Sequence, residues 1–462
     1  MDRFGVLALA WLVIGYFGLF DLGLGRALIK LVSEKIEANR TEEIRELVWT
    51  TLFLMVLLGL LGGGLLLAFT DSLVVSVLNI PAALQSEALD AFRLLAWSVP
   101  IVIVTTGLRG ILEAYQRFDL VNLVRVPTGV LTFVGPIAVL PLSNKLDAMV
   151  LVLLLLRVIV CLIHAAQCEK VLPGLLRRPL ISWHQVRPLL GLGGWMTVTN
   201  VVGPMMVYID RFVIGSVLSV AAVAYYVTPY EIITKLLVIP GALMGVLFPA
   251  FSANLSGDRT RALDLFRRAV RWIFLTMYPA VLLATVFASD GLRLWLTEEF
   301  SLKGTGVLQW LAAGVLLNGL AQIPFTFIQS AGRPDLTAKL HLAELLFYLI
   351  GLWECINHWG VTGAAAAWTL RSGIDTVALF LISGRLESDL KRAIKQNALM
   401  VAIGLTVLAI GSSLSGGLPS RIAFSILSMV CFSILAWRFL LAPDERALIN
   451  KGLLRFFGVN IP

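Results

Sequence analysis

The chain has 462 residues, of which 58% are hydrophobic and 14% charged, and its mean hydropathy is +0.88. Soluble domains carry about 25% charged residues, so this composition excludes a soluble globular fold and indicates repeated membrane-spanning segments. The net charge of +8 is spread over separate short loops. Membrane topology therefore explains the charge better than a nucleic-acid partner does.

Stretches of about 20 apolar residues are long enough to cross the hydrocarbon core as helices. About thirteen such stretches follow one another here, with a proline-punctuated linker between the fifth and the sixth. We therefore expect an all-α integral membrane protein. In chain order, the predicted spans are 4–36, 44–70, 86–114, 119–142, 146–170, 184–214, 219–252, 262–288, 305–330, 335–356, 360–384, 396–414 and 420–441.

Basic residues occupy every second gap between these spans. Lys and Arg collect in the loops that stay on the cytoplasmic side of a membrane. One inner gap, 259–271, contains five arginines. The outer gaps together hold only Arg3, Lys145, Arg293, Lys303 and Arg421. This alternation predicts a cytoplasmic C-terminus, and an odd number of spans then places Met1 outside.

Three sequence echoes at a nearly constant offset indicate an internal duplication. The offsets between the paired arginines are 216, 219 and 214 residues, and each pair lies on spans of matching order and direction. A matching direction makes the repeat parallel, with its pseudo-twofold axis along the membrane normal. The pairs are Arg117 with Arg333, Arg40 with Arg259, and Arg157 with Arg371.

The repeat predicts two helical lobes. Span 184–214 opens the second lobe, but its counterpart would precede Met1, so the first lobe lacks its opening helix. We expect either a natural reading frame that begins upstream or a shortened product. The predicted parts are an N-terminal lobe of five helices at 1–172, a cytoplasmic linker at 173–183, a C-terminal lobe of six helices at 184–390, two extra helices at 391–441 and a cytoplasmic tail at 442–462.

Five short motifs give the chain a family resemblance over almost its whole length. They are Phe20–Arg26 (FDLGLGR), Gln116–Phe118 (QRF), Tyr208–Gly215 (YIDRFVIG), Tyr226–Glu231 (YVTPYE) and Pro240–Ala242 (PGA). The chain resembles oligosaccharide flippases of the polysaccharide-biosynthesis type, in the multidrug/oligosaccharidyl-lipid/polysaccharide (MOP) exporter superfamily. The resemblance implies two six-helix lobes forming a V-shaped cavity, then two further helices. On that plan, we expect the first helix of the usual fourteen to be missing from this chain.

The resemblance also implies a function. The expected activity is a flippase that moves a polyprenyl-pyrophosphate-linked oligosaccharide across the bacterial inner membrane, by alternating access, for surface polysaccharide synthesis. Expected partners are the lipid-linked oligosaccharide, membrane lipids and other polysaccharide-assembly membrane proteins. Two alternatives stay open. One is a multidrug or organic-cation exporter of the same superfamily. The other is a membrane polysaccharide polymerase or ligase, which the four scattered histidines disfavour because they form no triad or metal spacing.

Arginine suits a pyrophosphate because its planar fork forms paired, charge-assisted hydrogen bonds. Arg157 lies mid-span with no acid within one helical turn, and an unpaired charge at mid-bilayer is costly enough to mark function. Arg371 has the repeat-equivalent position, although Asp375 one turn on also offers a structural ion pair. The predicted substrate-binding residues are Arg157, Arg371, Arg26, Arg109, Arg125 and Lys235.

Two of these arginines, Arg109 and Arg125, lie near the inner rim of the predicted cleft. They are expected either to receive the cargo head group there or to anchor helix ends by snorkelling.

Three acids inside spans are candidates for coupling transport to a proton or a sodium ion. Glu344 is a lone acid mid-span and is the predicted proton site. Asp21 lies in an interrupted helix, where it either lines the cavity or has a structural role. Glu231 precedes Lys235 by four residues, so a self-neutralised ion pair is the alternative for both.

The remaining polar residues have structural interpretations. Asp210 and Arg211 lie near the outer end of their span and are expected at the membrane interface. The four cysteines lie in or at the ends of spans without CxxC or histidine spacing. We therefore expect no disulfide, metal or cofactor.

Overall fold

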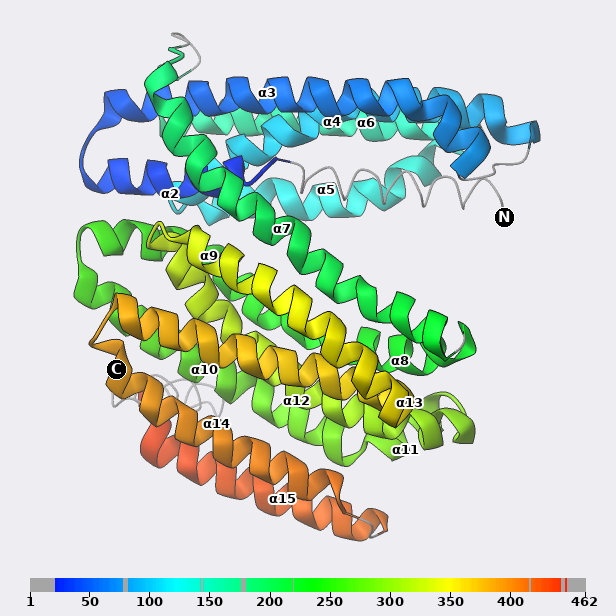
Figure 1. Ribbon diagram of the computed structural model, residues 1–462. Helices are drawn as coiled ribbons and strands as arrows, with labels where there is room; N and C mark the ends of the chain where they lie inside the picture. The colour runs from blue at the N-terminus through cyan, green and yellow to red at the C-terminus, as the bar shows by residue number, and fades with distance from the viewer. Residues whose placement is uncertain are drawn as a thin grey trace, which may run out of the picture. The chain divides into compact units, whose positions relative to one another are not determined.

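The computed structural model is all-helical over the residues it describes (Figure 1). Those residues are 21–77, 82–141, 143, 145–175, 180–218, 220–414, 417–441 and 445–446. Ten helical segments in this part of the chain are long and apolar enough to cross a membrane. The protein is therefore a multi-pass membrane protein, as the sequence predicts. The predicted tail at 442–462 lies almost entirely outside the described residues.

The ten segments account for eleven of the thirteen predicted spans. Spans 335–356 and 360–384 form one long helical element that is interrupted at Gly360, where φ is 57° and ψ is −138°. Span 184–214 is helical as predicted but is not among the ten apolar segments. Most of the first predicted span, 4–36, lies outside the described residues.

The chain divides into two compact units. Unit 1 contains the described residues up to Val201 together with 248–259 and 330–338. Within it, α3 packs against α4, and α6 packs against both α4 and α5. Its helices are α2 (Leu24–Glu37), α3 (Thr41–Ser72), α4 (Ala82–Ala114), α5 (Phe118–Val139), α6 (Leu146–Val171) and the first part of α7 (Trp183–Val217).

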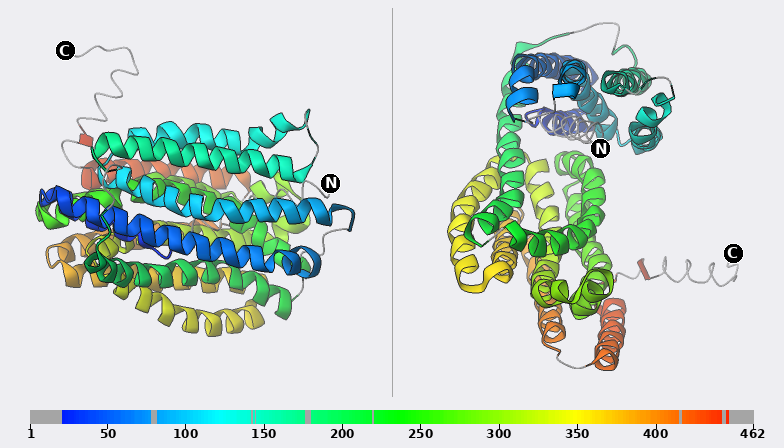
Figure 2. Two further views of the ribbon diagram at one scale, coloured as in Figure 1. Left: turned by 90° about the horizontal axis from the view of Figure 1, so that it is seen from above. Right: turned by 90° about the vertical axis from the view of Figure 1, so that its right-hand side faces the viewer.

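Unit 2 contains the rest of α7 and most of the chain that follows. A 3-10 turn at Thr234–Leu237 separates α8 from α9. The last two helices, α14 and α15, form a hairpin and run side by side (Figure 2). The further helices are α8 (Val220–Ile233), α9 (Val238–Ser256), α10 (Arg259–Val286), α11 (Ala288–Trp295), α12 (Glu298–Ser330), α13 (Pro334–Leu386), α14 (Leu390–Ser412) and α15 (Leu418–Leu435).

The turn before α5 and the turn before α13 share one design. Gln116 and Gly332 both adopt positive φ, at 57° and 80°. Arg117 and Arg333 follow them, and each donates two hydrogen bonds to the aspartate two residues on, at 2.8 and 2.9 Å in the first turn and 3.0 and 3.2 Å in the second. These carboxylates raise the pKa of both arginines. The match supports the predicted duplication.

Candidate functional site

A group of three arginines lies around Glu113 in unit 1. Arg109 is on the same helix, α4, and its Nε lies 3.2 Å from Oε1 of Glu113. Arg26 on α2 and Arg125 on α5 are close enough for their charges to act on the same carboxylate. Arg26 and Arg125 are exposed, as is the Arg109 side chain at 44%. Three helices thus bring three of the predicted substrate-binding residues together, and we call Arg26, Arg109 and Arg125 the basic cluster.

Asp21 belongs to the same neighbourhood, because its charge acts on Arg26 and Arg109. Its carboxylate is buried and accepts backbone hydrogen bonds from Gly23 at 3.0 Å and Gly25 at 2.9 Å. These bonds occupy two of the N–H groups that every helix start leaves unpaired. The contacts of Asp21 therefore cap α2. With Glu113, two carboxylates face three guanidinium groups, which leaves the neighbourhood with one excess positive charge.

The two arginines predicted as repeat equivalents have different surroundings. Arg157 on α6 is half-buried, and it has no ion-pair partner within the described part of the chain. Arg371 on α13 is buried, and its Nη1 lies 4.0 Å from Oε2 of Glu344. Its guanidinium also lies 5.4 Å from the centre of the Tyr348 ring. The two arginines that the predicted duplication pairs therefore have different partners.

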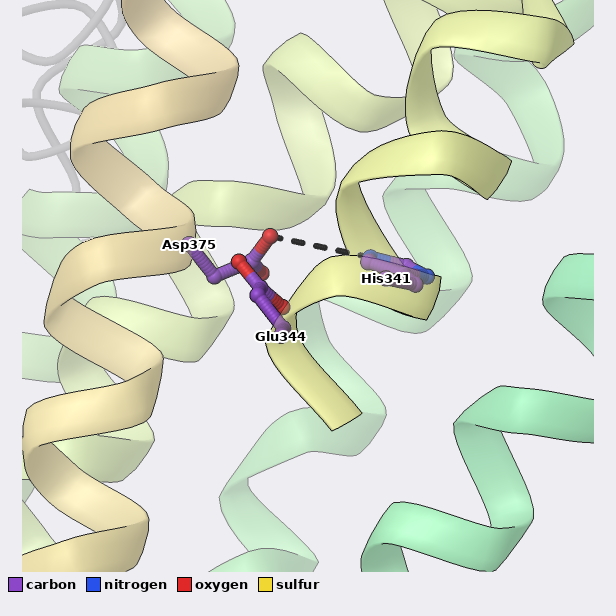
Figure 3. A group of neighbouring side chains, drawn as sticks. All are labelled: His341, Glu344 and Asp375. Atoms are coloured by element: carbon purple, nitrogen blue, oxygen red, sulfur yellow. Dashed lines mark ion pairs between the residues drawn. The ribbon is translucent and has the colours of Figure 1, made fainter. Parts of the chain in front are cut away.

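Unit 2 contains a buried polar cluster formed by the two parts of α13 on either side of Gly360. His341 and Glu344 come from the first part, and Asp375 from the second (Figure 3). One nitrogen or oxygen atom from each lies within 4.8 Å of the others, and Nε2 of His341 is 3.6 Å from Oδ1 of Asp375. The His341 ring stacks on Phe325 of α12 at a centroid distance of 5.6 Å.

Several atoms of this cluster are buried without a hydrogen-bond partner among the described residues. They are both carboxylate oxygens of Glu344, Oδ1 of Asp375, Nδ1 of His341 and Nε of Arg371. Buried polar atoms are almost always hydrogen-bonded in native proteins, so a group of unpaired ones indicates a place for a proton, an ion or water. The sequence singled out Glu344 and Arg371 but paired Arg371 with Asp375 rather than with Glu344.

Asp210, which is predicted near the outer end of its span, is fully buried in unit 2. One of its oxygens accepts a hydrogen bond from the hydroxyl of Tyr226, and the other accepts one from the backbone N–H of Arg211 at 2.7 Å. A phenol one helix away supplies the partner that makes burial tolerable. This pairing could not be predicted from the sequence, because the two residues are on different helices.

The predicted pair of Glu231 and Lys235 is present, with Nζ and Oε2 3.5 Å apart. Glu231 also accepts a hydrogen bond from Nη2 of Arg211 at 2.9 Å. The guanidinium of Arg211 in turn lies over the rings of Tyr208 and Tyr230, at 5.0 and 5.3 Å from their centres. The contacts of Glu231 and Lys235 thus account for both as members of a surface charge network.

Solved structures place the fold in a known class. A MATE transporter of Vibrio cholerae has 18% sequence identity and a TM-score of 0.71, covering 85% of this chain and 90% of that one. An outward-facing multidrug resistance MATE family transporter of the MOP superfamily has 19% identity and a TM-score of 0.70, covering 84% and 88%. The chain therefore has the fold of MOP superfamily transporters.

Sequence comparison then gives the family. Residues 1–302 match the family model described as polysaccharide biosynthesis protein. A Shigella flexneri protein described as an O-antigen transporter is 31% identical over 378 residues, which cover 82% of this chain and 89% of that one. A Haloferax volcanii protein described as a low-salt glycan biosynthesis flippase is 24% identical over 203 residues, covering 44% and 42%. The chain belongs to the polysaccharide biosynthesis protein family, and the relatives named here are transporters or flippases rather than enzymes.

Proposed function

We propose that this protein is a flippase that moves a polyprenyl-pyrophosphate-linked oligosaccharide from the inner to the outer leaflet of a bacterial inner membrane. Its product would supply surface polysaccharide synthesis, and it would work by alternating access with its C-terminus in the cytoplasm. Membership of the polysaccharide biosynthesis protein family and the likeness to an O-antigen transporter support this proposal. The observation that carries it is the basic cluster of Arg26, Arg109 and Arg125.

The chemistry of the cargo fits these residues. A pyrophosphate and a sugar chain lose their hydration in hydrocarbon, where each unpaired polar group costs roughly 4–8 kcal/mol. A guanidinium fork replaces that hydration with paired hydrogen bonds and opposite charge. The basic cluster offers three such forks on three helices, and Glu113 holds one of them at 3.2 Å. We infer that an arriving pyrophosphate competes with Glu113 for these arginines.

A second candidate function is export of an organic cation. The buried acids of unit 2, Asp210, Glu344 and Asp375, favour it, since they outnumber Arg371 and would attract positive charge. The fold likeness to multidrug transporters agrees with either function. An exporter would raise the drug resistance of a sensitive host, whereas the flippase would leave resistance unchanged and restore surface polysaccharide.

The basic cluster provides the direct test. The double variant Arg109→Gln with Arg125→Gln removes two guanidinium groups without introducing negative charge. Arg93→Gln is the matched control, because Arg93 is also on α4 and its side chain is 54% exposed. Each variant is expressed at equal level in the native host lacking its own copy. We expect the double variant to lose most surface polysaccharide and the control to keep it.

Normal surface polysaccharide in the double variant would contradict the assignment of the basic cluster to the cargo. A loss of equal size in Arg93→Gln would show that charge on α4 acts through folding or insertion instead.

A further inference from the structure

The buried cluster in unit 2 has a charge imbalance. Glu344 and Asp375 are each only 6% exposed, and one cationic side chain, Arg371, lies 4.0 Å from Glu344. With a neutral imidazole on His341, two carboxylates face one guanidinium, so one negative charge is left over. An uncompensated buried charge is strongly disfavoured, and such groups take up a proton or a counter-ion instead.

The positions of the atoms show where the missing charge belongs. The carboxylates of Glu344 and Asp375 point toward each other and toward His341 (Figure 3). Neither oxygen of Glu344 has a hydrogen-bond donor among the described residues, and Oδ1 of Asp375 has none either. Two adjacent carboxylates without donors are in the arrangement that shares a single proton, because both cannot be ionised at close range.

A metal ion fits this site less well. A divalent ion would overcompensate the single missing charge and leave the cluster positive. Hard cations also take shells of six to eight oxygen ligands, whereas one of the three donor groups here is the imidazole of His341. A proton needs only the two carboxylates, and a neighbouring imidazole is a natural partner for proton exchange.

We propose that His341, Glu344 and Asp375 form a proton-binding site in which the two carboxyl groups hold one exchangeable proton. His341 is the adjacent acceptor, 3.6 Å from Asp375. Ionisable residues inside membrane spans commonly mark proton paths. The buried atoms without hydrogen-bond partners locate such a path at these three residues.

Further charged and titratable groups face the site from neighbouring elements. Arg371 lies beside Glu344, and the ring of Tyr348 lies 5.4 Å from its guanidinium. Asp210 of α7 also acts on Arg371, and Tyr226 and Tyr230 of α8 lie next to Asp210. Arg211 acts on Asp210 more strongly than Arg371 does, so the charge balance of the site depends on Arg371, Glu344 and Asp375. Loss of the proton would strengthen the electrostatic attraction between Glu344 and Arg371. Protonation of the site would thus control the position of the Arg371 side chain.

Infrared difference spectra between neutral and alkaline pH test the site without any transport substrate. A protonated carboxyl group has a C=O stretch that a carboxylate lacks. In nanodiscs, we expect this band at neutral pH in the wild-type protein, with a shift when glutamate is labelled with carbon-13. Glu344→Gln and Asp375→Asn should both lose it, because the one remaining carboxylate then has no second carboxylate with which to share a proton.

The control is Glu354→Gln, since Glu354 lies on the same helix with a side chain that is 64% exposed. It should keep the band. A band that survives in Glu344→Gln, or a wild-type protein without one, would overturn the proposal. Loss of the band on adding sodium chloride at constant pH would overturn it in favour of a sodium site. If a variant fails to fold, the isotope shift in the wild-type protein still shows whether the protonated carboxyl group belongs to a glutamate, and a band without that shift would contradict a proton on Glu344.

The coupling of this proton to transport rests on the proposed function. In proteoliposomes that contain a lipid-linked oligosaccharide, we expect a pH gradient to speed flipping by the wild-type protein and to have no effect on Glu344→Gln. A carboxyl band without any flipping would leave the proton site standing and would contradict the proposed cargo.

Discussion

At the scale of single residues, Asp21 shows how a charge inside a span can have a structural explanation. Both of its oxygens accept backbone N–H groups at the start of α2. Asp21→Ala should therefore lower the stability of the folded protein by about 1–2 kcal/mol, the usual value of a lost helix cap. A thermal melt in detergent measures the change, with exposed Asp71→Ala as the control. An unchanged melting temperature together with lost transport would instead indicate ion coupling at Asp21.

Variants of Arg157 and Arg371 distinguish an arginine without an ion-pair partner from one that forms a structural ion pair. Arg157→Gln leaves no acid stranded among the described residues, whereas Arg371→Gln leaves the buried Glu344 without its cation. We expect Arg371→Gln to be the more destabilising change, by roughly 1–3 kcal/mol. Melting curves of the two variants give the difference directly. Equal melting temperatures would show that the pair at 4.0 Å contributes nothing to stability.

The sequence identified Glu344 and Arg371 because a lone charge in an apolar span is conspicuous without any structure. It could not show which charges meet. Asp375 is one turn from Arg371 in sequence, yet its contact is His341, and Glu344 faces Arg371 instead. Those contacts depend on the reversal at Gly360, which brings distant turns of α13 together. Spacing along a helix does not encode such pairings.

At the scale of elements, α3 and α4 of unit 1 approach each other closely at two glycines of α3. A Cβ on Gly59 would lie 2.4 Å from Cα of Pro100, and one on Gly63 would lie 2.6 Å from the carbonyl oxygen of Ala96. Small residues four apart let membrane helices approach in this way. Gly64, next in sequence, has open space around it and provides a matched control.

Gly59→Leu and Gly63→Leu should each force α3 away from α4. The expected loss of stability is about 1–3 kcal/mol, as for other overpacked contacts, while Gly64→Leu should be neutral. Limited proteolysis of the three variants in membranes measures their relative stability. Equal protease resistance in Gly59→Leu and Gly64→Leu would contradict the close packing.

The presence of most helices could be predicted from the sequence, whereas the points at which a helix is interrupted could not. Span 146–170 is observed as Leu146–Val171, because apolar length alone defines it. Span 219–252 is instead interrupted by the 3-10 turn at Thr234–Leu237. Pro240 lacks the N–H that would bond the carbonyl of residue 236, which explains a loosened helix there. The apolar composition of the span does not reveal the effect of one missing backbone N–H donor.

At the scale of the whole molecule, the predicted duplication has a consequence for topology. A parallel repeat requires equivalent turns to lie on the same side of the membrane. The turns at Arg117 and Arg333 share their left-handed residue and their bidentate aspartate pair. Both should therefore face the same compartment, which the distribution of basic residues indicates is the cytoplasm.

Single cysteines in a background without the four native ones test this topology. Ser388→Cys, between α13 and α14, should react with a membrane-impermeant maleimide only after the cells are opened. Thr297→Cys, between α11 and α12, should react in intact cells. The reverse pattern would invert the molecule, and labelling of both sites in intact cells would contradict the span assignment.

The most direct measurement is flipping of a fluorescent polyprenyl-pyrophosphate-linked oligosaccharide by the purified protein in liposomes. A membrane-impermeant quencher reports how much label has left the outer leaflet. We predict rapid exchange between leaflets with the wild-type protein and with Arg93→Gln, and near-background exchange with the Arg109→Gln, Arg125→Gln double variant. Exchange at the protein-free rate with the wild type, or at the wild-type rate with the double variant, would contradict the account.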